Sequence, residues 1–253
     1  MHRVKTFRHD LRQGAPLFGL FTRLADPDAV EALAASALDF VVLDVEHGSL
    51  GRGEISRIAA VARANDLPLL VRLAAPVHAD IHHAVAVGAT GVIVSHVADG
   101  AQAQAIAAFA RGAALERAYA GMGRAADFRR TAWPEFEASI REQFVVVAQI
   151  DDAAGLRAAK DIAATDGIDA VFVGSLSLAL ACATNGTAGT ERMVSDICKA
   201  CTSAGCRVGM HIVVPSELPS WTAQGVNLFV VGNDLNLLRQ GADRTVEQLR
   251  GSL

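Results

Sequence analysis

Short apolar runs rich in β-branched residues recur along the chain, and segments with helical spacing separate most of them. Apolar runs of about four to eight residues bounded by turns are typical of strands buried on both faces of a parallel sheet. The runs lie at 17–21, 40–45, 68–73, 91–95, 144–150, 170–174, 207–213 and 228–232. Helices are expected at 26–34, 54–65, 78–87, 100–109, 154–164, 191–204 and 215–224. Eight strand–helix units in 253 residues predict an α/β fold, a single (β/α)8 TIM barrel.

One segment, residues 111–141, interrupts this rhythm between the fourth and fifth runs. It contains Gly112, Gly121-Met122-Gly123 and a helix expected to begin at Trp133. Long insertions in barrels commonly form loops over an active site, so we expect an active-site loop here. No linker or low-complexity tract divides the chain, and residues 1–253 are expected to form one domain.

The composition excludes several classes of function. The chain is 51% hydrophobic and 20% charged with a net charge of −4, whereas a nucleic-acid-binding protein usually carries a basic patch. No apolar run reaches the roughly 18 residues of a membrane span. Residues 1–13 lack the apolar core of a secretory signal. We therefore expect a cytoplasmic protein without nucleic-acid or membrane partners.

The cysteines give little evidence of redox or zinc chemistry. All four lie in the last third of the chain, at 182, 198, 201 and 206. Cys198 and Cys201 have CxxC spacing, but they fall within a helical pattern and no second CxxC accompanies them. Small buried thiols are the expected interpretation.

The second apolar run ends in the ionisable residues Asp44, Glu46 and His47. Burying such groups is costly unless they are paired or used, and the C-terminal ends of parallel strands usually carry the active site. His47 is the natural general base because imidazole titrates near neutrality. The structural alternative is that Asp44 and His47 only cap the following helix.

Two further strands carry polar residues among apolar neighbours. Arg72 needs an anion for its planar guanidinium, either a substrate carboxylate or Asp44 within the protein. Gln149 could hold a carbonyl oxygen or a metal-bound water, or it could belong to a polar layer inside the barrel. Asp151, two residues later, could ligate a hard cation.

The remaining strand ends carry weaker signals. Gly174 and Ser175 offer backbone N–H groups that could cradle a carboxylate or phosphate, although a glycine turn explains them equally well. The other polar residues at strand ends are Ser95, His96, His211, Asn233 and Asp234.

Several segments, taken in order, resemble one known family. They are 18–21, 39–48, 68–72, 87–94, 148–151, 167–174 and 231–235. Together they resemble the HpcH/HpaI aldolases, of the 4-hydroxy-2-oxoheptanedioate aldolase type, over most of the chain. The resemblance implies a TIM barrel and a class II, metal-dependent pyruvate aldolase with small 2-oxo acid and aldehyde substrates. It also implies a homo-oligomer associated through C-terminal helices.

The resemblance also implies roles for individual residues. The residue matching His47 is the base, the one matching Arg72 polarises the oxo acid, and the one matching Gln149 belongs to the same site. The residues expected to be catalytic are thus His47, Arg72 and Asp44. Those expected to bind substrate are Arg72, Gln149, Gly174 and Ser175.

The metal position departs from the family pattern. The family metal lies between a glutamate, which is Asp151 here, and an aspartate, which is Ser177 here. An aspartate that supports the family's histidine is Ala86 in this chain. We therefore expect Mg²⁺ or Mn²⁺ to bind weakly at Asp151 and Ser177.

Three functions follow from these observations. The leading one is a carbon–carbon lyase that cleaves or forms 2-oxo acid aldols through a pyruvate enolate. Because of Ser177 and Ala86, the second is a catalytically impaired relative that binds small carboxylates. The third is a rewired barrel enzyme that holds another metal, such as zinc, with His96, His211 and Asp151.

Overall fold

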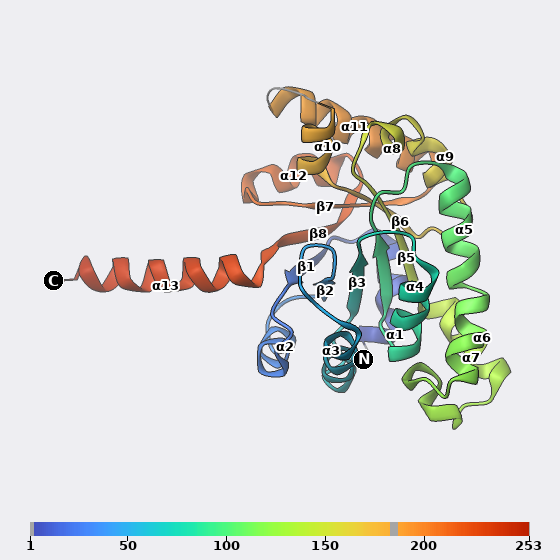
Figure 1. The fold of residues 1–253 in the computed structure, drawn as a ribbon. Helices are drawn as coiled ribbons and strands as arrows, with labels where there is room; N and C mark the ends of the chain where they lie inside the picture. The colour runs from blue at the N-terminus through green and yellow to red at the C-terminus, as the bar shows by residue number, and fades with distance from the viewer. Residues whose placement is uncertain (1–2, 183–186, 253) are drawn as a thin grey trace.

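The computed structural model describes residues 3–182 and 187–252. In this part of the chain, eight parallel strands close into a barrel in sequence order (Figure 1). The strands are β1 Leu17–Thr22, β2 Phe40–Asp44, β3 Leu69–Leu73, β4 Gly91–Val94, β5 Val145–Ile150, β6 Ala170–Val173, β7 Arg207–His211 and β8 Val226–Asn233. Each predicted run overlaps one of these strands, which confirms the (β/α)8 barrel.

Helices surround the barrel, and several of them begin at an Asp or Asn whose side chain caps the first turn. The side chain of Asp26 accepts hydrogen bonds from the backbone N–H groups of Asp28 and Ala29, which begins α2 as the sequence predicts. The expected helix at 154–164 is two short helices instead. The helices, in addition to two 3₁₀ turns, are α1 Arg3–Gln13, α2 Pro27–Ala34, α3 Arg52–Ala64, α4 His78–Val87, α5 Gly100–Ala110, α6 Ala113–Ala120, α7 Trp133–Gln143, α8 Ala153–Arg157, α9 Ala159–Ala163, α10 Ser175–Ala181, α11 Thr187–Ala204, α12 Leu218–Ala223 and α13 Asp234–Arg250.

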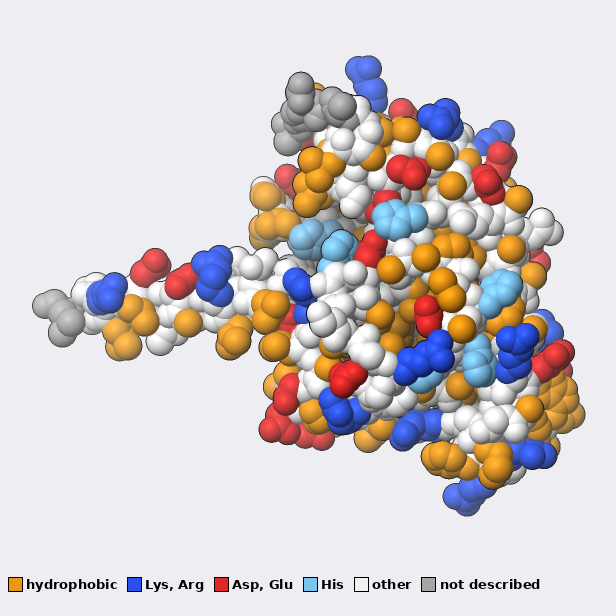
Figure 2. Space-filling model, viewed as in Figure 1, with side chains coloured by type: hydrophobic (Ala, Val, Ile, Leu, Met, Phe, Trp, Pro, Cys, Tyr) orange, Lys and Arg blue, Asp and Glu red, His pale blue; other side chains and the backbone are white. Residues whose placement is uncertain are grey.

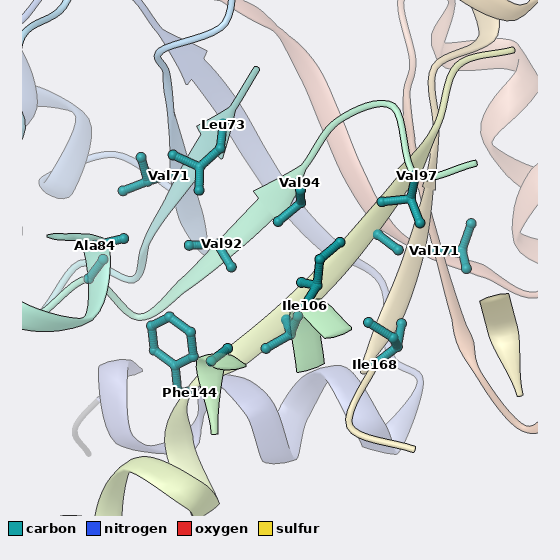
Figure 3. Close-up of a cluster of buried hydrophobic side chains, with 14 of the residues drawn as sticks. Val71, Leu73, Ala84, Val92, Val94, Val97, Ile106, Phe144, Ile168 and Val171 are labelled. Carbon is teal, nitrogen blue, oxygen red and sulfur yellow. The ribbon is translucent and has the colours of Figure 1, made fainter. Parts of the chain in front are cut away.

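The apolar core has two parts because side chains alternate between the two faces of each strand. One face packs outward against the helices, as Val71, Val92 and Val94 do against Ala84 and Ile106 in Figure 3. The other face fills the barrel. Helix α1 closes the N-terminal end of the barrel, where the rings of Phe7 and Phe40 lie 5.4 Å apart between centroids.

The same alternation aims polar side chains into the barrel mouth, which we define as the end where the strands finish. Val42, Leu70 and Val147 belong to the interior core. Each is followed two positions later by a polar residue on the same face: Asp44, Arg72 and Gln149. The apolar strands therefore carry a polar layer at their C-terminal ends.

Residues 111–141 lie at the opposite end of the barrel from the mouth. Helices α6 and α7 and the 3₁₀ helix η1 (Arg124–Arg129) pack against α4, α5 and α1 (Figure 1). Arg63, at the end of α3, donates a hydrogen bond of 2.6 Å to the carbonyl oxygen of Arg124. The prediction of an active-site loop does not match this position, because α5 has already returned the chain to the N-terminal end before residue 111.

Helix α13 projects away from the barrel, which Figures 1 and 2 both show. Its contacts are mainly with β1 and β8, near its own start. Leu238 and Leu249 are 67% and 65% exposed, and orange hydrophobic side chains follow one edge of the helix in Figure 2. Among the described residues, no helix has both the length and the apolar character needed to cross a membrane.

Candidate active site

A buried ion pair joins Asp44 and Arg72 at the mouth. The two residues are register partners on β2 and β3, so their side chains meet inside the barrel. Arg72 donates from Nε to Oδ1 at 3.0 Å and from Nη2 to Oδ2 at 2.7 Å. The guanidinium also lies 4.2 Å from the centroid of the Phe21 ring. Of the two anions considered for Arg72, the structure shows the internal one, Asp44. The Nη1 atom of the guanidinium takes no part in this bidentate contact.

The pair determines the charge state of Asp44. Burial alone would raise the pKa of this carboxyl group, but the hydrogen bonds and charge of Arg72 outweigh it, and His47 adds to them. The pKa of Asp44 is consequently lowered. Asp44 is therefore a carboxylate at neutral pH and accepts hydrogen bonds only.

His47 completes this group. Its Nδ1 atom lies 2.8 Å from Nη2 of Arg72 and 3.6 Å from Oδ2 of Asp44. Because a guanidinium can only donate, Nδ1 accepts the hydrogen bond and the proton of a neutral ring lies on Nε2. The His47 side chain is 57% exposed, so it can reach a molecule in the mouth.

A second group of polar side chains surrounds Glu46. Its Oε2 atom accepts a hydrogen bond of 2.8 Å from the hydroxyl of Ser95, and its Oε1 atom lies 2.9 Å from Nε2 of His96. The Glu46 side chain is 10% exposed. Its position at the end of a buried strand marked it as a candidate, but its contacts with Ser95 and His96 depend on β2 and β4 meeting at the mouth.

Asp151 and Gln149 form a third group after β5. Nε2 of Gln149 donates to Oδ1 of Asp151 at 2.8 Å, and the backbone N–H of His96 donates to Oδ2 at 3.0 Å. The Asp151 side chain is 2% exposed, and no lysine or arginine among the described residues forms an ion pair with it. Oε1 of Gln149 is buried without a hydrogen-bond partner in the same part of the chain. In this part of the structure, the group therefore contains a carboxylate without a lysine or arginine partner and an amide oxygen without a hydrogen-bond donor.

The sixth and seventh strands place three more candidates. Gly174 follows β6 directly and lies against Asp151. Helix α10 begins at the next residue, so that Ser175 and Ser177 lie in its first turn. His211 ends β7, and its ring centroid lies 6.1 Å from that of Phe21. Burial lowers the pKa of His211, and the charge of Arg72 adds to this effect.

Ala86 lies far from these groups within the chain. It is the penultimate residue of α4, and its backbone packs against Gly123 at the N-terminal end of the barrel. The carboxylate nearest to Nδ1 of His47 belongs to Asp44. Within one chain, His47 therefore has an adjacent carboxylate, Asp44, although position 86 is an alanine.

Two sets of carboxylates at the mouth differ in how they could hold a cation. Ligand atoms of Asp44, Glu46 and His47 lie within 4.8 Å of one another. Arg72 lies within 3.5 Å of all three, and its charge opposes a metal ion there. Asp151 is buried as well, and among the described residues no lysine or arginine pairs with it. The mouth thus combines an arginine, a histidine and a buried carboxylate, which are groups that can bind an anion, move a proton and hold a cation.

Known proteins resemble this chain over most of its length. The family model described as HpcH/HpaI aldolase/citrate lyase matches residues 17–240. A hydroxypyruvate/pyruvate aldolase from Roseovarius nubinhibens is 28% identical over 98% of this chain and 97% of its own length. A 4-hydroxy-2-oxovalerate aldolase from Novosphingobium aromaticivorans is 33% identical over 74% of this chain and 70% of its own length.

A solved structure supports the same assignment. An HpcH/HpaI aldolase/citrate lyase family protein from Burkholderia cenocepacia is 26% identical, with a TM-score of 0.88 over 97% of this chain and 99% of that one. The family model alone spans most of the barrel and all the strand ends described above. The chain therefore belongs to the HpcH/HpaI aldolase/citrate lyase family.

Proposed function

We propose that this protein is an aldolase that cleaves or forms aldols of small 2-oxo acids through a pyruvate enolate. The observation that carries the proposal is the contact of Arg72 with both Asp44 and His47. Asp44 orients the guanidinium, whose Nη1 edge is left to bind the oxo-acid carboxylate. The base and the anion-binding group are thus held next to each other.

His47 is proposed to move the proton. A bound oxo acid competes for the Nη2 hydrogen of Arg72, which releases Nδ1 of His47. The ring then carries its proton on Nδ1, toward Oδ2 of Asp44 at 3.6 Å, and Nε2 becomes basic. In the cleavage direction Nε2 takes the proton of the substrate's 4-hydroxyl group. The bond between C3 and C4 then breaks and releases the aldehyde. The enolate takes the proton back from Nε2, which gives pyruvate and restores the base.

The mouth also fits a divalent cation. The buried Asp151 lacks a lysine or arginine partner among the described residues. Oε1 of Gln149 is buried without a hydrogen-bond donor in the same part of the chain, and a water bound to a cation could donate to it. Asp151, assisted by the hydroxyl of Ser177, would hold Mg²⁺ or Mn²⁺. Such an ion, when bound, would supply positive charge that stabilises the enolate.

A lyase assay tests this function. Pyruvate release from 4-hydroxy-2-oxo acids is followed with lactate dehydrogenase, with and without divalent ions. We expect metal-dependent release, and a decrease in kcat of about 100-fold or more for His47→Gln. His83→Gln, on the outer side of α4, is the matched control. Release that is absent with every aldol would contradict the proposal.

The carboxylate-binding alternative rests on Ser177, the neutral residue at a family metal position. A relative of this kind keeps the Arg72 site and binds oxalate or pyruvate, as measured by calorimetry, without lyase activity. The rewired zinc enzyme has less support. The structure places His96 next to Asp151, but His211 packs near Phe21 on the other side of the mouth.

We also infer that the protein forms a homo-oligomer through α13. The exposed side chains of Leu238 and Leu249 would be covered by a second copy, as the family resemblance implies. Light scattering after size-exclusion chromatography tests this. We expect a multimer in the wild type and a smaller species for Leu238→Glu combined with Leu249→Glu. A monomeric wild type would contradict the inference.

A further inference from the structure

We propose that His96 is a ligand of the divalent ion and replaces the carboxylate that is missing at Ser177. The consequence is a preference for borderline transition metals such as Co²⁺ or Zn²⁺ over Mg²⁺. This inference rests on the metal site of the proposed function, and it assigns that site a nitrogen ligand.

The hydrogen bonding of His96 orients one ring nitrogen toward Asp151. Nε2 lies 2.9 Å from Oε1 of Glu46, and because a carboxylate only accepts, Nε2 carries the hydrogen. The lone pair of a neutral ring is then on Nδ1, which lies 3.6 Å from Oδ2 of Asp151. Two electron-rich atoms therefore face each other across a gap that suits a cation.

The distance between these atoms is close to that of two ligands on one metal ion. Metal–nitrogen and metal–oxygen bonds of about 2.1 Å place neighbouring ligand atoms about 3.0 to 3.5 Å apart. The separation of 3.6 Å between Nδ1 and Oδ2 needs only a small adjustment. The His96 side chain is 52% exposed, which leaves room for it.

Glu46 has the position of a supporting carboxylate. Histidines that bind metals usually donate their other N–H to a carboxylate or carbonyl oxygen, which fixes the tautomer and makes the ligating nitrogen more basic. Glu46 accepts from Nε2 in this way and is itself held by the hydroxyl of Ser95. Glu46 and His96 therefore have the arrangement of the carboxylate and the histidine in such a site, and Asp151 would be the second ligand of the ion.

The backbone also fixes His96 in this place. Its φ angle is +60°, a conformation that few non-glycine residues adopt, and its N–H donates to Oδ2 of Asp151 at 3.0 Å. The same carboxylate thus positions both the backbone of His96 and the proposed cation. The unpartnered Oε1 of Gln149, whose amide nitrogen binds Asp151, would accept a hydrogen bond from a water on that cation.

Ligand type explains the expected selectivity. Mg²⁺ prefers oxygen ligands and several waters, whereas imidazole suits Zn²⁺, Co²⁺ and Ni²⁺. A site that has the imidazole of His96 in place of a carboxylate at position 177 should therefore bind Mg²⁺ less tightly, relative to the transition metals, than a site with two carboxylates.

Pulsed electron paramagnetic resonance of the Mn²⁺-loaded full chain tests the ligand directly. We expect a ¹⁴N coupling from one histidine in the wild type, which is lost in His96→Gln and kept in His211→Gln. Calorimetry should show at least a tenfold weaker Co²⁺ affinity for His96→Gln, while Mg²⁺ affinity changes about threefold or less. Specific ¹⁵N-labelling of histidine in the wild type shows, without any substitution, that the coupled nitrogen belongs to a histidine.

The outcomes separate this inference from the proposed function. A wild-type spectrum without histidine nitrogen, or a coupling that survives in His96→Gln, overturns the inference whether or not the protein has lyase activity. A histidine coupling that depends on His96 supports it, even if the lyase assay fails and the aldolase proposal falls.

Discussion

Gly174 and Asp151 lie so close together that a β-carbon on Gly174 would collide with Oδ1 of Asp151. The φ angle of Gly174 is −79°, which any residue can adopt. The absence of a side chain, and not backbone freedom, is therefore what position 174 requires. The end of β6 sets the position of the carboxylate that follows β5.

The substitution Gly174→Ala should consequently move Asp151 and weaken divalent-ion binding. We expect the affinity for Mn²⁺ to fall about tenfold, which corresponds to 1.4 kcal/mol, with the fold retained. Calorimetry of the chelator-stripped protein measures the affinity, and circular dichroism checks the fold. Gly53→Ala is the matched control, because a β-carbon there meets no atom within 4 Å. Unchanged affinity in Gly174→Ala would show that Asp151 does not hold the ion.

Arg72→Lys should weaken the binding of pyruvate and of oxalate, an enolate mimic, because an ammonium group cannot replace the bidentate guanidinium. We expect at least a tenfold loss of oxalate affinity by calorimetry. The free energy of unfolding should also fall by about 1–3 kcal/mol, because Asp44 loses a charged hydrogen-bond partner.

The control for this experiment is Arg52→Lys. Arg52 pairs with Asp80 on the surface, where both side chains are about half exposed, and little change is expected. Equal oxalate affinity in wild type and Arg72→Lys would make Arg72 a purely structural partner of Asp44.

The lowered pKa of Asp44 predicts a loss of stability in acid. A carboxyl group whose pKa is lower in the folded state stabilises the fold above its unfolded pKa of about 3.9, and this stabilisation is lost as the pH falls through the folded value. Urea unfolding between pH 5 and pH 3 should therefore be less steeply pH-dependent in Asp44→Asn.

At pH 7, Asp44→Asn should cost about 3–5 kcal/mol, because Arg72 is left buried without its carboxylate. Asp80→Asn removes an exposed carboxylate and should retain the wild-type pH dependence. An Asp44→Asn variant with the wild-type slope would assign the acid sensitivity to other carboxyl groups.

Ser177→Asp should increase the affinity for Mg²⁺, since an added carboxylate is one of the main controls on hard-cation binding. We expect about a tenfold increase by calorimetry. Ser177→Asn, in which the new side chain has the size of aspartate but no charge, should not show this increase in affinity. If the protein is a weakened aldolase, lyase activity should rise together with affinity.

The sequence predicted the barrel and the mouth because both follow from local patterns. Runs of β-branched residues identify buried strands, and a polar residue two positions after an interior one must lie on the same face. Asp44 and Arg72 could thus be recognised, and their pairing could be considered before their register was known. The contacts of Glu46 with Ser95 and His96 could not be predicted from the sequence, because they depend on how the strands meet at the mouth.

The position of residues 111–141 could have been inferred from topology. A segment that follows a barrel helix lies at the N-terminal end of the strands, and 111–141 follows α5. The same rule places Ala86, near the end of α4, at that end. The projection of α13 could not be inferred, because an amphipathic pattern does not reveal which surface covers its apolar side.

The start of α13 is connected to His47 through a chain of hydrogen bonds. Oδ2 of Asp234 accepts from the hydroxyl of Thr22 at 2.7 Å and from the backbone N–H groups of Arg23 and Leu24 at 2.8 and 2.9 Å. The guanidinium of Arg23 in turn donates to the carbonyl oxygen of His47. If a second copy holds α13, the equilibrium between assembled and dissociated protein becomes linked by mass action to the geometry of the histidine. The activity per subunit and the thermal midpoint should then both decrease on dilution, in parallel with the fraction of assembled protein.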